Sequence, residues 1–273
     1  MNKTFQKIFA KAKAENRSCF VAFVTGMDPD YESSKQILIE LSKYCSVLEV
    51  GVSFNTSTSD RSIIMSANDR AIKSGARTEK IFQLIKEVKS EITSDTAFVT
   101  MGYLNQIHVY GIDKYIKDCK KSGVDGCIVV DSNNESPEDE LIFKGLTKND
   151  IAFIKLIAPT NDSAYIKQSL KKCSSWVYIV SYAGVTGSKD VNLENVKKLT
   201  KMIRKQSNIP IGVGFGVKTL EDVKKVSKLA DLVVCGSNIV ERIKEGSQNG
   251  LSGRNLAHFV SEYVINLAKG VKH

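Results

Sequence analysis

The stretch Cys45-Ser46-Val47-Leu48-Glu49-Val50-Gly51-Val52-Ser53-Phe54 is a short apolar run with one carboxylate near its end. Side chains alternate between the two faces of a β-strand, so Glu49 shares a face with Val47 and Gly51. An unpaired charge is costly to bury, and we expect Glu49 where the strand opens to solvent or ligand. A second carboxylate, Asp60, follows in a polar, loop-like segment. The pair suggests acid–base chemistry; the plainer alternative is a strand-end glutamate paired with a lysine.

Similar apolar runs recur along the chain, with helical patterns between them. The runs are Cys19–Thr25, Ser46–Val50, Ala97–Met101, Gly126–Val130, Ile151–Ile157, Trp176–Val180, Ile209–Val213 and Leu232–Cys235. The helical patterns are Tyr31–Lys43, Thr78–Lys89, Ile112–Ser122, a weaker one after Pro137, Asp162–Lys172, Leu193–Lys205, Thr219–Leu229 and Ile239–Glu245. Continuously apolar runs indicate strands buried on both faces, as in parallel sheets.

Eight strand–helix units favour an α/β fold of the (β/α)8 TIM-barrel type over a doubly wound sheet. The sequence predicts an extra N-terminal helix over Thr4–Ala14 and another helix over Asn255–Lys269. No linker or low-complexity tract interrupts the chain, which predicts a single domain over residues 1–273. In such barrels the chemistry lies at the carboxyl ends of the strands, which assigns Glu49 to the mouth of the barrel.

Composition narrows the class of protein. The 273 residues include 42% hydrophobic and 25% charged residues, an ordinary globular balance. The net charge of +9 invites a nucleic-acid hypothesis, but the cations are mostly lysines spread along predicted helices, which favours a solvated surface without nucleic-acid binding. No apolar run reaches the ~18 residues of a membrane span. With no secretion signal expected, six scattered cysteines favour a cytoplasmic protein with reduced thiols, and three separated histidines argue against a metal site.

Three glycine-bearing segments follow the last three predicted strands. They are Ser181–Gly187, Gly212–Val217 and Cys235–Asn238. Glycine lets backbone N–H groups approach an oxyanion, and barrels often bind phosphate with these loops and a helix N-terminus. Each segment alone could be a plain turn, but together they predict a phosphate site. The Gly-x-Gly-x-Gly spacing lacks the remainder of a dinucleotide-binding motif.

Motifs over nearly the whole chain resemble one known family, the α subunit of tryptophan synthase. They are Phe20–Thr25 with Asp28-Pro29, Leu48–Val52 with Phe54 and Asp60, Asn68, Arg70-Ala71, Tyr103, Asn105, Tyr110–Ile112, Gly123–Gly126, Val130-Asp131, Ile157–Thr160, Tyr178, Gly184–Gly187, Gly214–Gly216 and Gly236-Ser237. The Gly-Val-Thr-Gly and Gly-Phe-Gly strings at this mutual spacing are the most specific of them.

The resemblance implies a barrel that cleaves indole-3-glycerol phosphate to indole and glyceraldehyde 3-phosphate, a retro-aldol reaction without cofactor or metal in this chain. It implies that Glu49 is the general acid–base and that Asp60 accepts a hydrogen bond from the indole N–H. Substrate would contact Phe23, Met101, Tyr103, Tyr178, Thr186, Gly187, Phe215, Gly216, Gly236 and Ser237. The four residues Phe23, Met101, Tyr103 and Tyr178 could equally be core packing. The family's partner is a β subunit that carries pyridoxal phosphate, in an αββα assembly.

The chain departs from the family pattern mainly in its loops. Segment 53–62 lacks both family prolines and one aspartate, and Arg61 replaces a glycine; elsewhere, family residues are replaced by Met65, Gln106, Ser132-Asn133 and Tyr182. Three hypotheses follow. The chain is an active lyase subunit, or a weakly catalytic barrel that binds ligand and activates a β partner, or a phosphate-binding barrel enzyme with another substrate.

Overall fold

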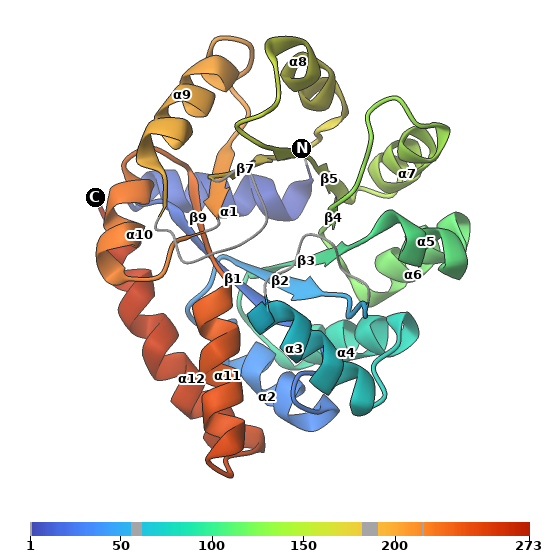
Figure 1. The fold of residues 1–273 in the computed structure, drawn as a ribbon, viewed down its shortest axis with the longest axis vertical. Helices are drawn as coiled ribbons and strands as arrows, with labels where there is room; N and C mark the ends of the chain where they lie inside the picture. Colours follow the sequence, from blue (N-terminus) through green and yellow to red (C-terminus); the bar gives the residue numbers. More distant parts are fainter. Residues whose placement is uncertain (1, 56–61, 182–190, 215) are drawn as a thin grey trace.

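The computed structural model describes residues 2–55, 62–181, 191–214 and 216–273, and within them the strands form one parallel sheet (Figure 1). Strands β1 to β9 span Cys19–Thr25, Val47–Gly51, Ala97–Gly102, Gly126–Val129, Ala152–Ile154, Leu156–Ile157, Val177–Val180, Ile211–Gly214 and Leu232–Cys235. The order across the sheet is β5-β4-β3-β2-β1-β9-β8-β7-β6. Because β5 and β6 are consecutive pieces of one segment, the two ends of this order meet and the sheet closes into the predicted barrel.

Helices surround the barrel, and the bounds of those that the sequence predicts lie within a few residues of the prediction. Helices α1 to α12 span Lys3–Ala14, Tyr31–Leu41, Ser62–Lys73, Thr78–Glu91, Leu104–Tyr110, Ile112–Ser122, Pro137–Lys148, Ser163–Lys172, Leu193–Arg204, Leu220–Ser227, Ser237–Gln248 and Gly253–Ala268, and a 3-10 turn, η1, covers Lys269–Val271. Polar caps begin several of them. Asp30 accepts from the Ser33 N–H at the start of α2, and Thr219 and Asp222 form a reciprocal capping box at α10.

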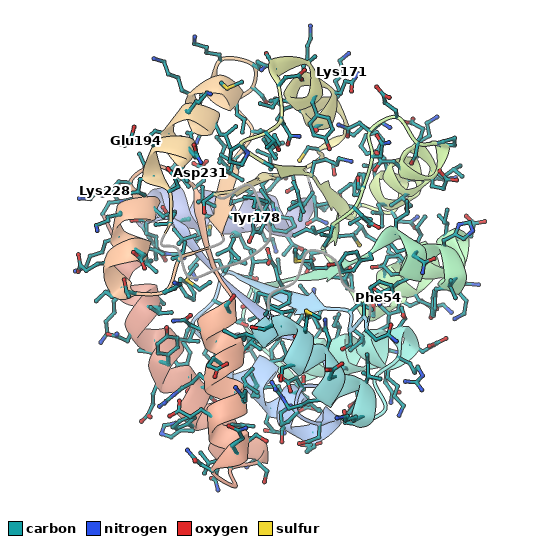
Figure 2. All side chains as sticks on the ribbon, viewed as in Figure 1. Phe54, Lys171, Tyr178, Glu194, Lys228 and Asp231 are labelled. Atoms are coloured by element: carbon teal, nitrogen blue, oxygen red, sulfur yellow. The ribbon has the colours of Figure 1, made fainter. Side chains whose placement is uncertain are left out.

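The strands divide the buried apolar side chains into two layers. In β2, Val47 belongs to the cluster inside the barrel, whereas Leu48 and Val50 pack outward against the helices. Helix α1 contributes Phe5 to the inner cluster, where its ring lies 6.5 Å from that of Trp176. Figure 2 shows the side chains of Lys171, Glu194 and Lys228 on the periphery and Tyr178 near the barrel axis. No helix in the described ranges is long and apolar enough to cross a bilayer.

The structure differs from the sequence prediction in two respects. The expected strand Ile151–Ile157 is interrupted at Lys155, whose ammonium turns outward to Asp139 of α7 at 2.9 Å. Both side chains are buried, at 2% and 1% exposure, so each charge needs the other. Helices α3 and α5 were not predicted. They follow β2 and β3, respectively, at the mouth of the barrel.

Candidate active site

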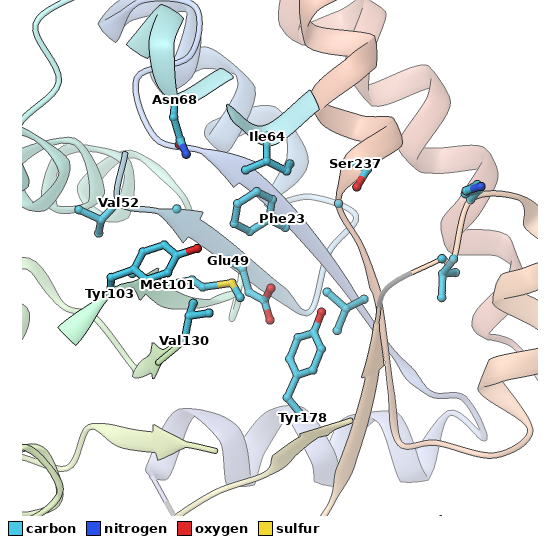
Figure 3. A pocket seen from close by; sticks show the side chains of 17 residues that line it. Phe23, Glu49, Val52, Ile64, Asn68, Met101, Tyr103, Val130, Tyr178 and Ser237 are labelled. Atoms are coloured by element: carbon cyan, nitrogen blue, oxygen red, sulfur yellow. The ribbon is translucent and has the colours of Figure 1, made fainter. Parts of the chain in front are cut away.

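A cavity lies at the carboxyl ends of the strands, enclosed by side chains from most of the barrel (Figure 3). It is lined by Phe23, Glu49, Gly51, Val52, Ile64, Asn68, Met101, Gly102, Tyr103, Val130, Tyr178, Gly216, Val217, Lys218, Val234, Gly236 and Ser237. The structure therefore brings eight of the sequence-predicted site residues together: Phe23, Glu49, Met101, Tyr103, Tyr178, Gly216, Gly236 and Ser237. Asp60, Thr186, Gly187 and Phe215 lie outside the described residues.

Glu49 is buried at the floor of this cavity. Parallel pairing places it beside Phe23 of β1 and Val99 of β3, and only 1% of it is exposed. Neither carboxyl oxygen of Glu49 has a hydrogen-bond partner among the described residues. No lysine or arginine among those residues forms an ion pair with Glu49. Burial raises the pKa of Glu49 to about 8. Near neutral pH the group therefore keeps its proton, yet can release it, as a general acid–base requires.

Tyr178 lies across the cavity from Glu49, and Figure 3 shows its hydroxyl pointing toward the carboxyl group. Burial, and secondarily the nearby Glu49 and Cys235, raise the pKa of the phenol well above its usual value. The phenol is therefore a neutral hydrogen-bonding group beside the acid. Gly214 makes this position possible, because a Cβ there would lie 2.0 Å from the Tyr178 hydroxyl.

Apolar side chains form the walls above Glu49. Phe23 of β1 and Met101 of β3 face the cavity on either side of β2, the strand that carries Glu49 (Figure 3), and Val130 and Ile64 also line it. Gly51 leaves the space that the Phe23 ring occupies, since a Cβ at residue 51 would lie 2.8 Å from its Cζ. Apolar walls with few polar groups suit a flat, largely apolar ligand.

One end of the cavity is suited to an anion. Gly216, Gly236 and Ser237 line it, and α11 begins at Ser237 with Gly236 as its N-cap. The first N–H groups of a helix have no intrahelical acceptor and, with the helix dipole, attract anions. Lys218 is the sole cation among the described lining residues, just as Glu49 is the sole carboxylate. The cavity thus joins an anion-binding end to an apolar body with an acid at its floor.

The sequence prediction missed Asn68 and Lys218 as lining residues. Asn68 lies one turn beyond Ile64 on α3 and is 4% exposed. The available signal was its place in the family resemblance. For Lys218 the signal was a cation directly after the Gly214–Gly216 glycines.

Two substituted loop positions make specific contacts in the structure. Gln106, which stands in place of a family proline, donates from Nε2 to the Ser53 carbonyl at 2.9 Å and accepts at Oε1 from the Tyr103 N–H at 3.1 Å. It thereby ties the start of the 53–62 segment to α5, where the Phe54 and Tyr103 rings also meet at 5.2 Å. Ser132 accepts from Lys155 and donates to Asp139. Arg61 and Tyr182 lie outside the described residues.

Metal ligands do not cluster in the parts of the chain that the structure describes: no group of three or more His, Cys, Asp or Glu side chains there could hold an ion. The six cysteines are buried free thiols.

Comparison with known proteins identifies the family. The family model of the tryptophan synthase alpha chain matches residues 9–268. A solved structure from Aquifex aeolicus VF5 is 28% identical and superimposes with a TM-score of 0.86, covering 100% of both chains. A tryptophan synthase alpha chain from Legionella pneumophila subsp. pneumophila is 25% identical, with a TM-score of 0.85 and coverage of 99% of this chain and 97% of that one.

The fold is also shared with a tryptophan synthase structure from Mycobacterium tuberculosis, which is 23% identical and covers 100% of both chains with a TM-score of 0.88. The resemblance seen in the motifs is therefore confirmed over nearly the whole length, and the chain belongs to the tryptophan synthase alpha chain family.

Proposed function

We propose that this protein cleaves indole-3-glycerol phosphate to indole and glyceraldehyde 3-phosphate. The observation that carries the proposal is Glu49: a buried carboxyl group without a described partner, with its pKa raised to about 8, beneath an apolar cavity with an anion-binding end. A lone acid at the floor of such a cavity is suited to proton transfer at carbon and oxygen of one bound substrate.

In the proposed reaction, protonated Glu49 delivers its proton to indole C3 and the bond from C3 to the glycerol chain breaks. The hydroxyl on the glycerol carbon that loses this bond gives up its proton to the Glu49 carboxylate as its carbonyl forms. The side chain thus ends protonated as it began, and the reaction balances without an external proton. A general acid–base of this kind is typically worth ~10²–10⁴ in rate.

The remaining site residues take supporting roles in the proposal. Phe23 and Met101 hold the indole ring, with Tyr103 and Tyr178 beside it. Gly187, Gly216, Gly236 and Ser237 hold the phosphate, with Lys218 as the neighbouring cation. Thr186 and Phe215 also contact the substrate. Asp60 accepts a hydrogen bond from the indole N–H, which stabilises positive charge that develops on the ring.

We further propose that residues 1–273 act as one cytoplasmic domain with a tryptophan synthase β subunit, which would supply the pyridoxal phosphate of an αββα assembly. All described strands share one sheet, which supports the single domain. The family membership and the M. tuberculosis tryptophan synthase structure support the partner.

The test is steady-state indole formation from indole-3-glycerol phosphate by the purified chain, alone and with its β subunit. We expect indole release above background alone and faster release in the complex. Background release in both cases would contradict the proposal.

The replacements at 53–62 and Tyr182 favour a second candidate, a weakly catalytic barrel that binds ligand and activates the β subunit. For that candidate the same experiment gives a different result: β activity rises on addition of the chain while cleavage stays at background.

A further inference from the structure

A second cavity opens at the amino ends of the strands, at the end of the barrel opposite Glu49. Helix α1, which Figure 1 shows lying across the barrel behind the strands, forms one wall. The turns before β2 and β3 and the segment around η1 form the others. The cavity has a volume of about 330 Å³, within the size range of small-molecule sites. We call it the amino-end cleft, and its function is independent of the function proposed above.

Cations outnumber carboxylates among the residues that line the amino-end cleft. Its charged lining residues are the cations Lys7, Lys11, Arg17, Lys43 and Lys272 and the single carboxylate Asp95. Lys7, Lys11 and Lys272 are exposed and make no ion pair with any described residue. A cleft lined by one sign of charge focuses its field and concentrates ions of the opposite sign.

Three cations of the cleft, Arg17, Lys11 and Lys272, lie close enough to Glu15 to lower its pKa. Arg17 donates to Glu15 at 2.6 Å, and this hydrogen bond, followed by the charges of Arg17, Lys11 and Lys272, lowers the pKa of Glu15. Arg17 itself is held in the wall, with Nη1 on the Ser18 carbonyl at 3.1 Å. Arg17 is thus ion-paired with Glu15, and Lys43 is ion-paired with Glu40 at 2.6 Å. Among the described residues, Lys7, Lys11 and Lys272 are therefore the cations of the cleft that are left to contact an anion.

The floor of the cleft is apolar. Ile8, Phe20, Cys45 and Val271 lie there, all 5% exposed or less, and the ring of Tyr44 stands at the rim with 39% exposure. A fully solvated inorganic anion would use only the cationic rim. An occupant that also covers this floor needs an apolar part next to its charges.

We propose that the amino-end cleft binds a phosphorylated small molecule with an apolar body, of the nucleoside di- or triphosphate class. Lys7, Lys11 and Lys272 contact the phosphates, and the nucleoside lies against the apolar floor beside Tyr44. A chain of two or three phosphates can contact several cations at once, whereas a ligand with a single carboxylate cannot.

Isothermal titration of the full chain with ATP tests the proposal. The candidate active site is first saturated with an indolylalkyl phosphate, and ionic strength is kept near 0.15 M to suppress nonspecific attraction. We expect one ATP site, with weaker binding of pyrophosphate and of adenosine. No heat with ATP, or equal affinity for ATP and pyrophosphate, would overturn the proposal.

A matched pair of double variants locates the site. Lys7→Gln with Lys11→Gln removes two cations spaced four residues apart on α1, whereas Lys167→Gln with Lys171→Gln removes the same pattern from exposed positions on α8. The first pair should weaken ATP binding about tenfold or more, and the second should leave it unchanged. Thermal melting of both variants shows whether they remain folded. Equal weakening by both pairs would assign the binding to net charge and refute the site.

Discussion

Replacing Glu49 by Gln should stabilise the folded protein at alkaline pH. Burial raises the pKa of Glu49 from 4.5 to about 8. Between these values the unfolded chain has released a proton that the folded chain retains, so the free energy of unfolding falls as pH rises. Each pH unit is worth about 1.36 kcal/mol, and the interval from 4.5 to about 8 therefore amounts to about 5 kcal/mol at most. Gln does not ionise and escapes this loss.

Urea unfolding at about pH 5, 7 and 9 measures the effect as the difference in free energy between the Glu49→Gln variant and the original chain. We expect that difference to grow in favour of the variant by several kcal/mol across the series. Glu194→Gln changes a side chain that is 84% exposed and should give a curve parallel to the original. A pH-independent difference, or a variant that becomes relatively less stable at pH 9, would refute the argument and indicate an ion-paired glutamate.

Three further substitutions test the wall of the cavity, its anion-binding end and the contact between α5 and Ser53. Gly51→Ala places a Cβ 2.8 Å from the Phe23 ring, and displacing that ring costs ~1–3 kcal/mol. The affinity for an indolylalkyl phosphate, measured by calorimetry, should therefore fall. Unchanged affinity would contradict the close fit. Lys218→Gln should lower the affinity for the same ligand about tenfold and leave the affinity for free indole unchanged. Equal losses of affinity for both ligands would exclude a phosphate contact. Gln106→Ala removes the bonds to Ser53 and Tyr103 and should cost ~1–3 kcal/mol in urea unfolding, together with slower indole release; wild-type stability would show that these bonds contribute nothing.

The barrel was predictable because buried parallel strands have a direct signature in the sequence. The runs at Cys19–Thr25 and Leu232–Cys235 coincide with β1 and β9, and their spacing indicated a crossover helix after each strand. The break at Lys155 was not predictable, because a lysine inside an apolar run becomes outward-facing only through Asp139, which lies on a separate helix.

Helix α3 was not predicted, although its buried residues Ile64, Ala67, Asn68 and Ala71 recur at helical spacing. The barrel pattern assigns one helix to each strand, and the helix predicted over Thr78–Lys89, which is α4, already filled that place after β2. Helix α5 is too short for a periodic signal, with Ile107 as its one buried residue among seven.

For the site, the sequence placed Glu49 at the mouth of the barrel but could not show its degree of burial. That property depends on Phe23, Met101 and Tyr178, which come from other strands and close over the carboxyl group. Periodicity reports the face on which a side chain lies, whereas a pKa depends on everything packed around it.

The central claim is that the Glu49 carboxyl group transfers the proton in cleavage. Its most direct test is single-turnover conversion of indole-3-glycerol phosphate by the Glu49→Gln variant, with binding of an indolylalkyl phosphate measured on the same preparation. The account predicts that binding is retained while indole formation falls by ~10²–10⁴. Indole formation at the original rate by a variant that still binds the ligand would contradict it.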